Sequence, residues 1–264
     1  MTGGSPWLGQ PRRIAGAALV AGTLIASLAS CALSIGGLQH RTSSYTIETR
    51  ITTLVVTNQA GDVHVTGDSS RAVSVTERIS FHGTAPATTH RISAGTLSLI
   101  SHCPATETCT VGYTITVPRK TTVRVTAAAG SVALGSLGGP VTVHVNAGKI
   151  SLSSLAGSVD ATSSAGSIRG QRLSSTNASL HVSAGDINVT FSTPATAITA
   201  STEVGAITVR VPDTVEYHVT ASAAVGDVHV SVSRSPAAAR TITASTKTGS
   251  ITIEPSGPAS KTSE

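Results

Sequence analysis

The chain has 264 residues and a net charge of +5, with only 2% aromatic and 12% charged residues. No cluster of Lys or Arg accompanies this mild positive charge, so nucleic acid is excluded as an expected partner. Ala, Ser, Thr, Val and Gly dominate, which favours strands and turns over helices. The core is therefore expected to consist of Val, Ile, Leu and Ala.

The N-terminus has the pattern of an export signal. An arginine pair precedes an apolar, small-residue run over residues 14–30, which is short for a membrane span. The run ends in "LASC" at 28–31, which resembles the lipobox of bacterial lipoproteins, in which signal peptidase cuts before a cysteine that carries diacylglycerol. We predict a lipoprotein signal peptide over residues 1–30 and lipidation of Cys31. An uncleaved anchor helix and an ordinary secretory signal are the alternatives.

Three cysteines are present, Cys31, Cys103 and Cys109. With lipid on Cys31, an even pair remains in an oxidising compartment, which favours a disulfide between Cys103 and Cys109. Closing the loop "CPATETC" is worth roughly 2–2.5 kcal/mol in the chain-entropy model. Metal binding by His102 and the same two cysteines is the rival interpretation, but zinc sites usually show a second ligand pair nearby, and the sequence has none.

A glycine-centred repeat fills most of the chain. Two positions after each aligned glycine lies an aliphatic residue, and a second follows two positions later in most units. Apolar residues also precede most of these glycines by five and seven positions. The two alternating runs are out of phase by one residue, so the chain must turn between them, and glycine suits a corner that needs positive φ. The aligned glycines are Gly61, Gly95, Gly130, Gly148, Gly157, Gly166, Gly185, Gly205, Gly226 and Gly249.

Repeats of about 20 residues indicate a stacked architecture, because one unit cannot bury its aliphatic face alone. We predict an all-β domain over residues 45–255, a β-solenoid-like stack of short two-stranded repeats of about 20 residues. About ten rungs, ~4.8 Å apart, would make a rod on the order of 50 Å long. A twisted β-sandwich of hairpins buries the same residues and stays open as the alternative.

The ends of the domain are predicted to differ from its middle. Residues 31–44 are expected to be a tether, and residues 256–264 a disordered polar tail. Residues 45–118 fit the repeat less well and are expected to form an irregular cap that the disulfide pins, as terminal repeats require. Residues 119–255 hold the regular repeats.

One group of bacterial proteins shares these features. In "YTITVPRKTTVRVTAAAGSV" at 113–132, a strand ending in Val-Pro leads to a Val-x-Val run and a Gly-x-Val turn, and related units recur at 141–170, 182–189 and 221–232. This pattern resembles the cell-envelope β-strand-repeat family whose members are named as adhesins, although the family's function is unknown. The resemblance implies a stacked β fold at the cell surface, often behind a signal or lipid anchor, and supplies no established catalytic residues.

No enzymatic motif is found. The sequence lacks the Gly-x-Ser-x-Gly elbow, the Gly-x4-Gly-Lys-Ser/Thr phosphate loop and His-Glu-x-x-His. An enzyme that cleaves glycans needs paired carboxylates over a groove, whereas the candidate acids are scattered and mostly lie at turns, where Asp commonly solvates the backbone. These acids are Asp160, Asp186, Glu203, Asp213, Glu216 and Asp227. We expect no catalytic residue, no metal and no cofactor.

The pentapeptide "GDVHV" occurs at 61–65 and again at 226–230. Its Asp and His would share a strand face, as a duplicated ligand pair would, but they occupy positions that the repeat leaves variable. The histidines that alternate with aliphatic residues are therefore predicted to be solvated residues of the outer face. They are His64, His144, His181, His218 and His229.

The sequence as a whole predicts a non-catalytic, lipid-anchored protein on the extracytoplasmic face of the bacterial cell membrane, acting as an adhesin or structural interaction module. Its expected partners are the membrane, through the N-terminal lipid, and an unidentified protein or cell-wall polymer. An envelope regulatory or sensory subunit working with membrane partners is the alternative function, and a glycan-acting enzyme is the least favoured. Secretion, or anchoring by an uncleaved N-terminal helix, is the alternative localisation.

Overall fold

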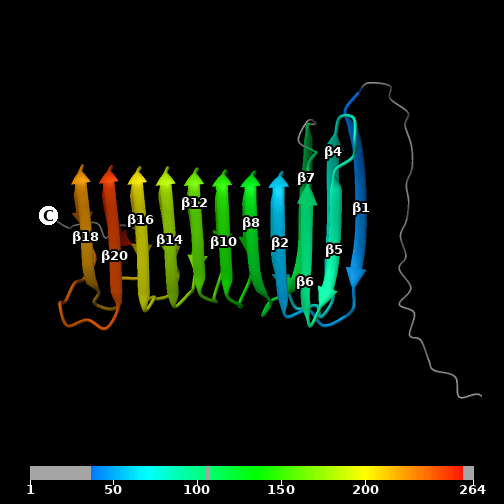
Figure 1. The fold of residues 1–264 in the computed structure, drawn as a ribbon. Helices are drawn as coiled ribbons and strands as arrows, with labels where there is room; N and C mark the ends of the chain where they lie inside the picture. Colours follow the sequence, from blue (N-terminus) through cyan, green and yellow to red (C-terminus); the bar gives the residue numbers. More distant parts are fainter. Residues whose placement is uncertain (1–36, 105–107, 258–264) are drawn as a thin grey trace, which may run out of the picture.

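The computed structural model of the protein describes residues 37–104 and 108–257. The predicted signal peptide, the predicted lipidation residue Cys31 and most of the predicted tail lie outside these described residues. Within the described ranges, no helix is long and apolar enough to span a membrane. The described chain folds into strands, which form two long sheets with one aliphatic core between them (Figure 1).

Sheet A has eleven strands. Their spatial order is β1 (Gln39–Ile47), β4 (Val73–Phe81), β7 (Cys109–Pro118), β3 (Val63–Asp68), β9 (Val132–Gly135), β11 (Ile150–Ser153), β13 (Ile168–Leu173), β15 (Ile187–Phe191), β17 (Ile207–Val211), β21 (Ile251–Pro255) and β19 (Val228–Val230).

Sheet B has ten strands. Their spatial order is β18 (His218–Val225), β20 (Thr241–Thr248), β16 (Ala197–Val204), β14 (Asn177–Ala184), β12 (Val159–Ala165), β10 (Val141–Ala147), β8 (Thr122–Ala129), β2 (Thr53–Ala60), β6 (Thr96–His102) and β5 (Ala87–Ser93).

A regular rung consists of one strand of sheet B, a corner and one strand of sheet A. In the rung of β10 and β11, Val141 and Val143 are buried in the first strand, and Ile150 and Leu152 in the second. Neighbouring rungs pair in parallel and in register, so Val141 lies beside the equivalent residues of both neighbours. The predicted β-solenoid-like stack is confirmed, and the sandwich of hairpins is wrong, because consecutive rungs pair in parallel.

The corner from sheet B to sheet A requires glycine. Eight ladder glycines occupy this corner, all with φ between +115° and +147°, a region that side chains rarely adopt. A Cβ on Gly166 would lie 1.9 Å from the carbonyl oxygen of Gly148, the ladder glycine of the neighbouring rung. The ladder glycines are Gly61, Gly130, Gly148, Gly166, Gly185, Gly205, Gly226 and Gly249.

Two aligned glycines do not lie at this corner, which corrects the predicted rung count. Gly157 has no positive φ and lies at the opposite corner, where a Cβ would meet the carbonyl oxygen of Gly139 at 2.1 Å. Gly95 lies in the turn between the antiparallel strands β5 and β6. In the middle of the chain, Gly148, Gly157 and Gly166 lie only nine residues apart, because the alignment combined glycines from corners of two kinds. The described residues form eight such rungs, where the alignment predicted about ten.

The N-terminal end is a cap, but its composition differs from the prediction. Strands β1, β4 and β7 extend sheet A with antiparallel pairing, and β5 with β6 extends sheet B. Next to these cap strands, β2 and β3 form a regular rung that pairs in parallel with β8 and β9, although both strands belong to the segment expected to be irregular. Strand β1 begins at Gln39, so part of the predicted tether is a strand.

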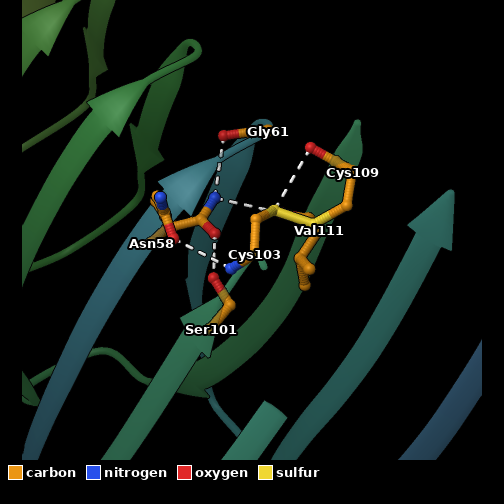
Figure 2. The surroundings of a disulfide bond; sticks show 7 residues. Asn58, Gly61, Ser101, Cys103, Cys109 and Val111 are labelled. Atoms are coloured by element: carbon orange, nitrogen blue, oxygen red, sulfur yellow. Dashed lines mark hydrogen bonds between the residues drawn. A yellow bond between two sulfur atoms is a disulfide. The ribbon is translucent and has the colours of Figure 1, made fainter. Parts of the chain in front are cut away.

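A disulfide joins the two sheets within the cap. Cys103 follows β6 and Cys109 begins β7, and their Cα atoms lie 5.8 Å apart (Figure 2). Beside it, the buried Asn58 amide donates to the carbonyl oxygens of Gly61 at 2.8 Å and Val111 at 3.0 Å, while its oxygen accepts a hydrogen bond from the Ser101 hydroxyl. These bonds satisfy polar groups that burial would otherwise penalise, and they hold the first corner against β7.

At the C-terminal end, spatial order departs from chain order. The rung of β18 and β19 lies outermost, and the chain then returns to insert β20 and β21 between that rung and the rung of β16 and β17 (Figure 1). The terminal rung in space is therefore the penultimate rung in the chain.

Candidate functional site

An open pocket of about 580 Å³ lies on sheet A where the cap meets the first rung. Its lining includes Asp62 and His64 of the first "GDVHV", together with Arg78 on β4 and Gly112 and Thr114 on β7. Sequence reasoning proposed no binding site here, because the residues that meet in the pocket come from four separated segments.

The pocket forms at a step in sheet A. Strand β7 pairs with β4 from Cys109 to Thr116, whereas its pairing with β3 begins only at Tyr113. The start of β7 and the end of β4 therefore extend past the corner at Gly61 and rise above the ends of the neighbouring rungs (Figure 1). The lower side of the step is formed by small residues at two corners, Ala60 with Gly61 and Ala129 with Gly130. Gly112 leaves the wall without a side chain, and a Cβ there would meet only ordinary contacts, the nearest at 3.7 Å.

The pocket offers one guanidinium and several hydroxyls, and the one carboxylate in its lining, that of Asp62, accepts a hydrogen bond from the Ser131 amide. Arg78 is exposed, its Nη1 donates to the Thr114 hydroxyl at 3.2 Å, and it makes no ion pair with any acid in the described part of the chain. Ser80 and Thr110 lie opposite each other in the β4–β7 register and also line the pocket. A guanidinium surrounded by hydroxyls suits a carboxylate or phosphate attached to a hydroxyl-rich molecule.

The Asp of the pentapeptide has a structural task. The Asp62 carboxylate accepts a hydrogen bond from the Ser131 amide of the next rung at 2.8 Å, and Asp186 accepts one from the Ala206 amide at the same distance. These aspartates satisfy backbone amides at the corner, in agreement with the interpretation of turn acids as residues that solvate the backbone. His64 is exposed on the outer face, as the alternation predicts.

The structure does not bring the two copies of the pentapeptide together. Strand β3, which holds the first copy, is separated from β19, which holds the second, by six strands of sheet A. The remaining candidate acids stay dispersed: Glu203 pairs with Lys247 at 3.1 Å on the surface, and Asp213 accepts from the Ser233 amide at 2.7 Å. Among the described residues, no group of three or more His, Cys, Asp or Glu side chains is placed to hold a metal ion.

A buried carboxylate lies behind the pocket. Glu77 on β4 is only 5% exposed, and its Oε1 accepts a hydrogen bond from the Tyr45 hydroxyl at 2.9 Å. Tyr113 pairs with it across β4 and β7 and also lines the pocket. Burial, and then the Glu77 carboxylate, raises the pKa of both tyrosines. The sequence signal was present, because in "VSVTERISF" the acid occupies an inner-face position between Val75 and Ile79.

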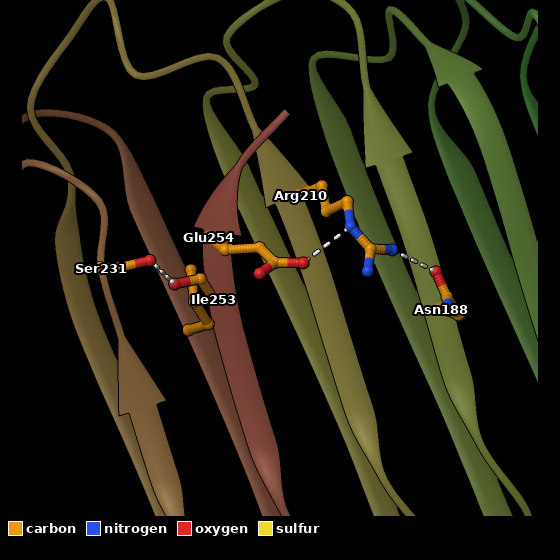
Figure 3. A network of polar contacts seen from close by, with 5 residues as sticks. All are labelled: Asn188, Arg210, Ser231, Ile253 and Glu254. Atoms are coloured by element: carbon orange, nitrogen blue, oxygen red, sulfur yellow. Dashed lines mark hydrogen bonds and ion pairs between the residues drawn. The ribbon is translucent and has the colours of Figure 1, made fainter. Parts of the chain in front are cut away.

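A column of mostly polar side chains, with Ala133 as the apolar member, continues from the pocket along the outer face of sheet A. In register, His64 is followed across successive strands by Ala133, Ser151, Arg169 and Asn188. Beyond them, Arg210 contacts Glu254 at 2.7 Å and donates to the Asn188 side chain at 2.9 Å, which links β15, β17 and β21 (Figure 3).

A family model described as Toastrack DUF4097 matches residues 23–254. The chain belongs to the Toastrack DUF4097 family. No curated protein matches it. Solved structures that resemble this Toastrack chain include a proposed adhesin from Bacteroides fragilis, with 17% identity, a TM-score of 0.47 and coverage of 81% of this chain and 97% of that one.

Two further structures are similar to the Toastrack chain at lower identity. A proposed cell adhesion protein from Clostridium sporogenes has 13% identity and a TM-score of 0.37, with 82% of this chain and 100% of that chain covered. A proposed lipid binding protein from Parabacteroides distasonis has 12% identity and a TM-score of 0.44, with coverage of 83% and 98%. The membership of a β-strand-repeat family that the sequence indicated is confirmed by the family model, which says nothing of adhesion.

Proposed function

We propose that this Toastrack protein is a non-catalytic, lipid-anchored interaction module of the cell surface that binds an anionic, hydroxyl-rich wall polymer through the pocket at the cap. The observation that carries the proposal is Arg78, an exposed cation without an acidic partner in the described structure, in an open pocket lined by hydroxyls. Such a group is available to a ligand, because no internal ion pair has to be broken first.

The chemistry of the pocket fits this class of ligand. A guanidinium binds carboxylate or phosphate with two parallel hydrogen bonds, and the hydroxyls of Ser80, Thr110 and Thr114 can donate to or accept from sugar hydroxyls. Beyond Ala133 on the strand next to the pocket, Ser151 and Arg169 would continue the contact across successive strands. A linear polymer suits this arrangement better than a compact small molecule.

The proposed anchor is consistent with the position of the pocket. The described chain begins beside β1, at the capped end of the stack that also carries the pocket. Lipid on Cys31 would therefore hold the pocket toward the membrane-proximal layer of the envelope, on the extracytoplasmic face.

Binding to purified wall-polymer fractions tests the ligand. The full chain in detergent is compared with Arg78→Ala, which removes the cation, and Gly112→Val, which adds a side chain to the pocket wall at a position where a Cβ would lie no closer than 3.7 Å to the nearest atom, the Arg78 carbonyl oxygen. Arg78→Ala is expected to weaken binding about tenfold or more, the cost of losing a charge-assisted contact, and Gly112→Val should weaken binding because its side chain takes up space that the ligand needs. Arg124→Ala, an exposed arginine on the outer face of sheet B, is the matched control and should bind normally.

Equal binding by all variants would contradict the assignment of the pocket as the binding site. Release of soluble sugar products by the full chain would contradict the proposal that the protein is not an enzyme. If the full chain captures a crosslinked envelope protein and no polymer, and Arg78→Ala abolishes this capture, the ligand of the pocket is a protein and the proposed polymer is wrong.

Membrane fractionation tests the anchor separately. Cys31→Ala should move the protein from the membrane fraction to the soluble fraction, since lipid on this residue would no longer be attached. An unlipidated wild-type chain that stays in the membrane fraction would overturn the anchor.

A further inference from the structure

The C-terminal end of the stack presents two free strand edges. Strand β18 pairs with β20 and strand β19 with β21, and in the described chain neither carries a further strand along its outer side (Figure 1). An edge of this kind offers a row of unpaired backbone N–H and C=O groups.

Hydrogen bonds at the base of β18 show which groups are free. The His218 amide points toward the neighbouring rung and donates to the Arg240 carbonyl oxygen at 2.8 Å. The Tyr217 amide points toward the free edge of the sheet and donates to the Ser233 carbonyl oxygen at 3.0 Å. Because backbone groups alternate along a strand, the groups above Tyr217 that face the free edge are those of Val219, Ala221 and Ala223, whereas the Val225 carbonyl oxygen accepts a hydrogen bond from the Gly249 amide of the neighbouring rung at 2.9 Å.

The chain itself demonstrates that this edge accepts a strand. The Ser235 amide returns a bond to the Tyr217 carbonyl oxygen at 3.1 Å, so Tyr217 and Arg234 form a parallel bridge one residue long. The segment then leaves the edge, and β18 above this point stays open.

The core is also open at this end. Val228 is 44% exposed, although Ile251, at the same repeat position in the neighbouring rung, is 0% exposed. The inner-face residues Val219 and Ala221 are only partly buried, whereas Ile242 and Ala244, at the same positions of the neighbouring rung, are 0% and 1% exposed. Val219, Ala221 and Val228 are inner-face side chains that one more rung would cover.

The opposite end is protected in ways that this end is not. At the cap, Arg41 on β1 and Arg91 on β5 place charges on the two edge strands, and the ring of Tyr45 lies 4.9 Å from that of His90 between the sheets. Charged side chains are the usual device that keeps an edge strand from pairing. Strands β18 and β19 contain no Lys, Arg, Asp or Glu.

We propose that the C-terminal end pairs with the C-terminal end of a second copy, with β18 antiparallel to β18 and β19 antiparallel to β19 about a two-fold axis. A single extended peptide would cover one edge, whereas a second copy presents two edges and an open aliphatic layer that match both. In a two-fold contact every edge strand faces itself, and edge strands without charged residues meet themselves without repulsion. The capped ends then lie at opposite extremes of a doubled rod.

Sedimentation of the full chain in detergent over a range of concentrations tests this pairing, with hydrogen exchange read in parallel. The paired variant Thr220→Lys and Ser222→Lys places like charges on the outer face of β18, where the two copies would meet. Thr142→Lys with His144→Lys is the matched control, since these residues occupy the same two columns on β10, several strands inside the sheet.

Wild type and control should form a dimer whose β18 and β19 amides gain protection as concentration rises, and the edge variant should stay monomeric, with the melting temperature of wild type at concentrations low enough for both to be monomers. Monomers at every concentration would overturn the proposal. A dimer that survives the edge variant, or protection that rises at β1 and β5 instead, would do so equally.

Discussion

The two copies of "GDVHV" have identical residues and opposite surroundings. In the first, β3 lies between β7 and β9, and Val63 and Val65 are 0% and 1% exposed. In the second, β19 has one neighbour, and Val228 is 44% exposed. The corner glycines agree, with φ of +115° at Gly61 and +123° at Gly226. The local sequence therefore determines the corner and the face, while the rung's place in the stack determines burial.

The glycines test what the copies share, and they carry the largest expected effect. A Cβ would lie 2.5 Å from the Val111 carbonyl oxygen at Gly61 and 2.1 Å from that of Gly249 at Gly226. Gly61→Ala should lower the free energy of unfolding by on the order of 3 kcal/mol, and Gly226→Ala should destabilise the terminal rung by a similar amount. Urea unfolding measures the first effect and amide exchange in β18 and β19 the second. Gly257→Ala, with open space around it, should change neither.

The valines test where the copies differ. Val63→Ala removes two buried methyl groups and leaves a cavity, so it should cost about 2–3 kcal/mol. Val228→Ala removes the same groups from a side chain that is 44% exposed, and should cost less than about 1 kcal/mol. Chemical unfolding of both variants at low protein concentration provides the comparison. Equal losses would mean that place in the stack does not set burial.

Alkaline unfolding tests the cap beside the first copy, where Tyr113 pairs with Val63. The pKa of Tyr113 is raised in the folded protein, first by burial and then by Glu77. Its contribution to stability is therefore complete below the unfolded pKa of about 10 and is lost as pH rises above that value, by up to about 1.4 kcal/mol per pH unit. Tyr113→Phe should flatten this loss, because its ring cannot ionise. If Tyr113→Phe loses stability with rising pH as steeply as wild type, ionisation of Tyr113 is not a cause of the alkaline unfolding.

The aspartates give the smallest expected difference. Asp62 accepts a hydrogen bond from the Ser131 amide, whereas Asp227 has no such side-chain bond among the described residues. Asp62→Ala should cost about 1 kcal/mol and Asp227→Ala close to nothing. Thermal melts of the two variants, with the corresponding Asn substitutions as controls, measure the difference. Equal costs would remove the structural role assigned to Asp62.

Alternation along the chain predicted most of the fold because it reports directly which side chains face inward. It identified the eight ladder glycines and the phase change at each corner. It failed at Gly157, because a glycine at the opposite corner is followed by the same alternation. At Gly170, the expected aliphatic residue is absent, and the Leu173 side chain fills that space through an irregularity in the strand.

The order of the last rungs and the pocket could not be predicted. The edge strand β18 and the inserted strand β20 have the same alternation of inner-face and outer-face residues, so the repeat pattern does not indicate which of the two strands lies outermost. The pocket depends on how far β4 and β7 extend past the corner at Gly61, which is a matter of strand pairing between distant segments. Glu77 was readable as an inner-face acid, but its tyrosine partners lie on other strands.

Residue-resolved amide exchange of the full chain at low concentration tests the central claim most directly. The amides of Val63 and Val65 should exchange only through global unfolding, since β3 is paired on both sides. The outward amides of Val228 and Val230 should exchange orders of magnitude faster, while the His229 amide between them, directed at β21, stays protected. Equal and uniform protection of the two pentapeptides in the monomer would contradict the account.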